Sequence, residues 1–141
     1  MVNELIVAIS IKLNKAFGDG YRTYTDVKQG LEEPCFFIKV LRPSQKQFVG
    51  NRYYRQHEFD VHYFPEKSDS NTELYTMGAS LFDVLEEIVL ENGDRIQGIE
   101  PAYEVIDGVL HFFVGYNAIV KKVTVAEESM DEMQIQGNLK G

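Results

Sequence analysis

The chain has 141 residues, 44% of them hydrophobic, with one cysteine and a formal net charge of −8. A chain of this length builds one hydrophobic core, so we expect a single domain over residues 1–141. The lone Cys35 excludes an internal disulfide, and the acidic balance argues against a dedicated nucleic-acid-binding protein. The sequence opens on no signal peptide and holds no bilayer-spanning apolar run, so we expect a cytoplasmic product without membrane contact.

The first half of the chain predicts one helix and then strands. Apolar residues at three- and four-residue spacing predict a helix over Asn3–Phe17, with Asn3 as its cap and Gly18 at its end. A short strand is predicted over residues 21–25, followed by a polar linker over 26–33. Residues 34–41 are apolar on both faces, which is typical of a central strand.

A long strand is predicted over Arg52–Phe64, with two alternating faces. Residues 42–51 are polar and contain Pro and Gly, so we interpret them as a connection. The two flanking strands then form a hairpin with a long, protruding tip.

The second half predicts a helix and further strands. Ser70–Glu73 matches a capping box and opens a helix that continues to Asn92–Gly93. Gly78–Ser80 in that helix indicates close packing against the sheet or the first helix. Asp107–Gly108 predicts a tight turn between strands 102–106 and 109–116, and residues 123–125 and 132–139 predict closing strands. The order indicates an α+β fold, with two main helices on a largely antiparallel or mixed sheet plus the long protruding hairpin.

Charge is segregated along the sequence. Pro34–His57 contains no acidic residue and five basic ones, so this segment carries +5 and the other 117 residues carry −13. Such segregation can steer one copy of a protein onto another copy, or onto an acidic partner. A solvated basic hairpin with no partner is the alternative interpretation.

Polar residues that could carry chemistry are few. Glu58, Asp60 and His62 share one strand face, but side chains in a row along a strand diverge, and His111 can join them only if its strand lies alongside. We therefore interpret these residues as a solvated face, and His57 as a packing residue. Cys35 lies in an apolar strand, where a thiol is inert. No phosphate-binding loop or nucleophile elbow is present, so we predict no enzyme activity, no catalytic residue, no metal and no cofactor.

The segment Glu33–Pro65 resembles the tail terminator family of tailed phages and prophages. Tyr21–Tyr24, which follows the opening helix, and Asp107–Phe113 support the resemblance, which weakens after Tyr116. The resemblance implies a structural virion protein that assembles as a six-membered ring on the head-proximal end of the tail tube. Such a ring stops growth of the tube and presents a docking surface to head-completion proteins. It also implies assembly in the bacterial cytoplasm and residence at the junction of tail and neck.

A protein of this kind has three partners: other copies of itself, the tail tube protein, and a head-completion or connector protein. DNA would pass through the channel without specific binding, because an acidic surface repels it. The residues predicted to contact a neighbouring subunit or the tube are Arg42, Gln45, Lys46, Gln47, Phe48, Asn51, Arg52, Tyr53 and Arg55. Two alternatives remain: another neck or head-tail connector subunit, and a small module that binds single-stranded nucleic acid through basic and aromatic residues.

Overall fold

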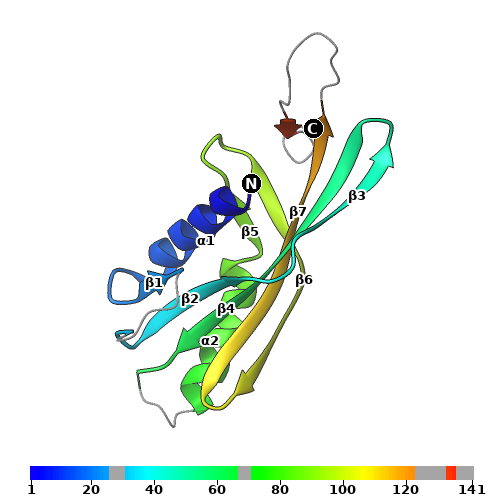
Figure 1. Ribbon diagram of the computed structural model, residues 1–141. Helices are drawn as coiled ribbons and strands as arrows, with labels where there is room; N and C mark the ends of the chain where they lie inside the picture. Colours follow the sequence, from blue (N-terminus) through cyan, green and yellow to red (C-terminus); the bar gives the residue numbers. More distant parts are fainter. Residues whose placement is uncertain (26–30, 67–70, 123–132, 136–141) are drawn as a thin grey trace.

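A computed structural model describes residues 1–25, 31–66 and 71–122, together with the backbone of residues 133–135. Helices α1 (Val2–Phe17) and α2 (Asn71–Val84) lie on one side of a curled sheet (Figure 1). The strands are β1 (Arg22–Tyr24), β2 (Cys35–Val40), β3 (Ser44–Val49), β4 (Arg52–Phe64), β5 (Glu87–Val89), β6 (Arg95–Ile106), β7 (Val109–Lys122) and β8 (Met133–Ile135). The predicted α+β class is confirmed.

Strand β4 organises the sheet, whose main order is β1-β2-β4-β7-β6-β5. One edge of β4 pairs with β7 from Arg52 to Tyr63. The other edge pairs first with β3 and then with β2. Only β1 and β2 run parallel among the described pairs, so the sheet is mixed, as predicted.

The core lies between the helices and one face of the sheet. Phe59, Val61 and Tyr63 of β4 are at most 1% exposed, and Phe112 and Tyr116 of β7 lie beside them. The helices add a stripe of buried residues to the same cluster, among them Leu5, Ile9, Leu13, Leu74 and Leu81. The predicted division of Arg52–Phe64 into two faces is correct. The side of the sheet that the helices do not cover is called the helix-free face.

The prediction for residues 42–51 is wrong. Ser44–Val49 forms β3 rather than a connection, and every residue of this strand is exposed. A strand on an edge can be polar on both sides, so its composition resembled that of a loop. The long protruding hairpin is not confirmed, because β4 residues 52–56 pair with β3 on one side and with β7 on the other.

The second predicted helix is too long. It ends at Val84, and the segment expected to continue it forms β5, which pairs with β6. The backbone N–H of Gly98 donates to the carbonyl of Glu86 at 2.7 Å and so draws this segment onto the sheet. The spacing of apolar residues up to Ile88 favours a longer helix, but pairing with β6 determines the structure here.

The caps also differ from the predictions. Helix α1 begins at Val2 with Met1 in the capping position, so Asn3 does not cap it. Ser70 of the predicted capping box lies outside the described residues. Its partner Glu73 accepts hydrogen bonds from the Tyr63 hydroxyl at 2.6 Å and from the Glu66 backbone N–H at 2.9 Å.

Two local predictions are confirmed. A Cβ on Gly78 would lie 2.7 Å from the ring of Tyr103 in β6, so α2 does pack closely on the sheet there. Asp107 and Gly108, with φ of 48° and 76°, form the tight turn between β6 and β7. Of the predicted closing strands, β8 lies within residues 132–139, whereas residues 123–125 lie outside the described residues.

Candidate functional site

The hairpin of β3 and β4 holds eight of the nine residues predicted as an interface. Phe48 and Val49 are 49% and 65% exposed, an unusual position for large apolar side chains. The residues Gln45, Lys46, Gln47, Asn51 and Arg52 are exposed, whereas Tyr53 and Arg55 are half-buried. Exposed apolar side chains that lie among basic ones are typical of a protein–protein interface.

Contacts within the hairpin fix its shape. The Arg55 Nε–H donates to Gln45 Oε1 at 2.6 Å, and the Gln47 amide donates to the Gly50 carbonyl at 2.8 Å. The Phe48 and Tyr54 rings lie 6.4 Å apart. The surface is therefore preorganised, which lowers the entropic cost of binding.

One face of the hairpin gathers basic residues. Arg52 lies on the helix-free face, and Lys46 shares that face as the register partner of Tyr54. Lys121 of β7 is the register partner of Arg52 and extends the basic surface. The sequence could not reveal Lys121 as a member, because the pairing of β4 with β7 brings it there from 69 positions away.

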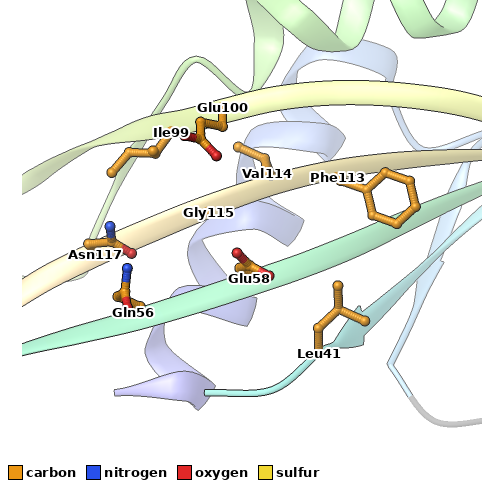
Figure 2. A pocket seen from close by; sticks show the side chains of 9 residues that line it. All are labelled: Leu41, Gln56, Glu58, Ile99, Glu100, Phe113, Val114, Gly115 and Asn117. Atoms are coloured by element: carbon orange, nitrogen blue, oxygen red, sulfur yellow. The ribbon is translucent and has the colours of Figure 1, made fainter. Parts of the chain in front are cut away.

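Arg42 does not join this cluster. It precedes β3 and lines a shallow hollow with Ser44, Gln56 and Glu58. This hollow lies beside a second one of about 280 Å³, formed where β4, β7 and β6 run side by side (Figure 2). The second hollow is lined by Leu41, Gln56, Glu58, Ile99, Glu100, Phe113, Val114, Gly115 and Asn117.

Backbone features create the second hollow. Gly115 contributes no side chain on β7, and the register of β6 shifts between Ile99 and Ala102. At that bulge Glu100 has a φ of 50°, a left-handed conformation that is uncommon outside glycine. Figure 2 shows the carboxylates of Glu58 and Glu100 on opposite sides of β7. An acidic rim around apolar groups suits a basic and apolar partner, and sequence patterns gave no indication of it.

A second cluster lies on the same face, nearer the end of β4. Asp60, His62 and His111 meet because His62 and His111 are register partners on β4 and β7. The interpretation of these residues as a solvated face is wrong for Asp60, which is 7% exposed. Glu58, the fourth residue considered, is exposed and does not join them.

The cluster centres on one carboxylate oxygen. Asp60 Oδ2 lies 3.1 Å from His62 Nε2 and 3.1 Å from His111 Nδ1. Burial raises the pKa of Asp60, but contacts with the two imidazoles outweigh burial and leave that pKa below its usual value. The carboxyl group is therefore ionised at neutral pH.

The remaining polar candidates are packing residues. Burial and the nearby Glu33 raise the pKa of the Cys35 thiol to about 11, so it stays protonated at neutral pH. His57 is 3% exposed, and its Nδ1 lies 3.1 Å from the carbonyl oxygen of Tyr116. Both residues belong to the core, as the sequence indicated.

The comparison with protein families gives a match over most of the chain. A family described as phage tail terminator protein matches residues 4–128. No curated protein matched the chain. No helix among the described residues has the length and apolarity that a membrane span requires.

Proteins of the matched family are structural components of the phage virion rather than enzymes, and they interact with other parts of the tail and head. The match covers well over half of the sequence. The exposed hairpin and the acidic hollow suit a protein that works through contacts with other chains. This chain belongs to the phage tail terminator family.

Proposed function

We propose that the protein forms a ring, expected to be a hexamer, on the head-proximal end of the tail tube. The ring stops polymerisation of the tube and gives head-completion proteins a surface on which to dock. The protein assembles in the bacterial cytoplasm and remains at the junction of tail and neck. Family membership supports the terminator role, and the distribution of charge on the helix-free face supports the ring.

The observation that carries the proposal is a pair of complementary surfaces on one chain. The basic hairpin offers Lys46, Arg52 and the exposed Phe48. The hollow offers Glu58 and Glu100 around apolar side chains. Two different, complementary patches on one subunit produce a head-to-tail contact, which closes into a ring when the rotation between subunits permits.

We assign the hairpin of one subunit to the hollow of the next. The ring of Phe48 would fill the apolar part between Leu41 and Phe113, and the basic groups would lie against the carboxylates. Opposite charges on the two patches also favour the correct register and accelerate association. The acidic remainder of the chain, at −13 outside the basic segment, would let DNA pass through the channel without adhering.

A charge exchange tests this contact. The double variant Lys46→Glu/Arg52→Glu should prevent ring formation, measured by analytical ultracentrifugation and by capping of tails in vitro. Arg55 is not used, because its hydrogen bond to Gln45 holds the hairpin together. Placing Glu58→Lys and Glu100→Lys in the same chain should restore assembly, since each contact then has reversed charges on both sides.

The matched control reverses two basic residues elsewhere. Lys15 of α1 and Arg22 of β1 are exposed and lie outside both the hairpin and the hollow. The ion pair of Arg22 with Glu32 is exposed and contributes little to stability, so Lys15→Glu/Arg22→Glu should assemble normally. If the hairpin variant caps tails as well as the control does, or if the exchange restores nothing, the assigned contact is wrong.

A connector subunit remains the other candidate, because it needs the same kind of surfaces. Electron microscopy of particles assembled without this protein distinguishes the two functions. Tails longer than normal support a terminator. Tails of normal length that lack heads would show instead that the protein joins the head to a tube already ended by another protein.

A further inference from the structure

We propose that Asp60, His62 and His111 form a binding site for a divalent transition-metal ion, with Zn²⁺ as the best fit. The ion would join β4 to β7 on the helix-free face. The inference does not depend on the proposed ring, because all three ligands belong to one chain.

The donor atoms already converge. Asp60, His62 and His111 each offer one ligand atom, and these three atoms lie within 4.8 Å of one another. Ligands 2.0–2.1 Å from a tetrahedral zinc lie about 3.3 Å apart. The two contacts to Asp60 Oδ2 measure 3.1 Å, so two of the three spacings already match such a site.

The cluster also leaves polar atoms that a cation would satisfy. Asp60 Oδ1 and His62 Nε2 are buried and have no hydrogen-bond partner among the described residues. His62 Nε2 lies 3.1 Å from Asp60 Oδ2, close enough for both atoms to bind one ion. A buried carboxylate with an unpaired oxygen is costly, and a dication bound through Oδ2 would neutralise the charge of that carboxylate.

Aromatic neighbours hold both imidazoles in place. The His62 ring stands edge-on to Phe37 at 5.4 Å, and its centre lies 4.3 Å from that of His111. The His111 ring is stacked on Phe113 at 6.3 Å. Ligands whose rings are already oriented lose little entropy on binding a metal.

The donor set selects the metal. Imidazole nitrogen suits Zn²⁺ and its neighbours in the first transition row, whereas Mg²⁺ and Ca²⁺ prefer oxygen ligands throughout. Three protein ligands leave the fourth tetrahedral position to water. The two histidines are half-buried, with side chains 15% and 18% exposed, so an ion can enter from solvent.

Isothermal titration of the chelator-treated full-length protein with Zn²⁺ tests the site. One ion per chain should bind, and Mg²⁺ should not compete. Loss of an outer partner of a metal ligand costs roughly 10–100-fold in affinity. Loss of a direct ligand in Asp60→Asn or His111→Gln should therefore cost at least about 100-fold. Glu104→Gln, which removes an exposed carboxylate opposite His111 on β6, should bind as the parent does.

Two further readouts separate metal binding from a folding defect. Zn²⁺ should raise the melting temperature of the parent and of Glu104→Gln, but not of the ligand variants, whose far-UV spectra should match the parent. In NMR spectra, Zn²⁺ should shift the ring signals of His62 and His111 and leave those of His57 unchanged. Absence of one-to-one binding by the parent, or equal affinity in Asp60→Asn and His111→Gln, would overturn the proposal.

Discussion

The Tyr116 hydroxyl donates a 2.6 Å hydrogen bond to the carbonyl oxygen of Leu85, the residue that follows α2. Both residues are at most 1% exposed. The bond connects the centre of β7 to the point where the chain leaves the helix. Burial raises the pKa of this hydroxyl, so it remains a donor at every pH at which the protein is handled.

Tyr116→Phe should therefore destabilise the protein. The substitution keeps the ring and leaves the Leu85 carbonyl without this donor, which costs about 1–3 kcal/mol. Urea unfolding followed by circular dichroism measures the loss. Tyr54→Phe is the control, because the Tyr54 hydroxyl accepts from Asn117 in a partly exposed position. Equal effects of the two substitutions would contradict this view of the buried bond.

Gly98→Ala should destabilise the fold for a different reason. A Cβ on Gly98 would lie 2.9 Å from the backbone oxygen of Leu85 and 2.9 Å from Val114 Cγ2. The backbone cannot move aside as a flexible side chain can, so we expect the free energy of unfolding to fall by about 1–3 kcal/mol. Gly20→Ala should be nearly neutral in the same unfolding experiment, because nothing lies within 4 Å of its added carbon. A neutral Gly98→Ala would show that the end of α2 can move away from β6.

His57 should make stability depend on pH. Burial lowers the pKa of the folded imidazole, although its contact with the Tyr116 carbonyl partly opposes this. The unfolded chain has a histidine pKa of about 6.5. Below that pH the unfolded state binds a proton that the folded state does not, so stability falls as the pH falls below about 6.5.

The slope contributed by His57 is at most about 1.4 kcal/mol per pH unit. Unfolding free energies measured between pH 7.5 and pH 5 should fall less steeply in His57→Gln, which keeps a donor for the Tyr116 carbonyl. Identical slopes in the two proteins would show that His57 does not contribute.

Phe48→Ser should separate assembly from stability. The side chain is 49% exposed on an edge strand, so its replacement should change the free energy of unfolding by less than about 0.5 kcal/mol. Self-association should weaken strongly if Phe48 enters the neighbouring hollow, as sedimentation at increasing concentration will show. Normal association of this variant would remove Phe48 from the contact.

The sequence predicted elements well where burial gives a clear period. Strand β4 was predicted over its full range because apolar and polar residues alternate along most of it, and the β6–β7 turn because Asp107–Gly108 favours positive φ. Prediction from the sequence failed for β3, which is polar because it is an edge strand. It also failed for β5, whose residues continue a helical pattern. Only tertiary pairing distinguishes these cases.

The candidate sites also differ in how far the sequence alone could predict them. The basic hairpin is contiguous in sequence, so composition was enough to find it. The acidic hollow and the metal cluster each depend on β7 lying beside β4. The pairing of His62 with His111 was recognised as the necessary condition for the cluster, but one sequence contains no information on whether that condition holds.

The pairing of β4 with β7 limits how the hairpin can change. Twelve successive register pairs connect the hairpin end of β4 to its core end. Inserting one residue between them would turn Phe59 and Val61 toward solvent and Asp60 and His62 into the core. Length changes that keep the fold must therefore fall at the Gly50–Asn51 turn, or come in steps of two residues per strand. A terminator adapted to a different partner would vary at the tip of this hairpin and keep the spacing behind it.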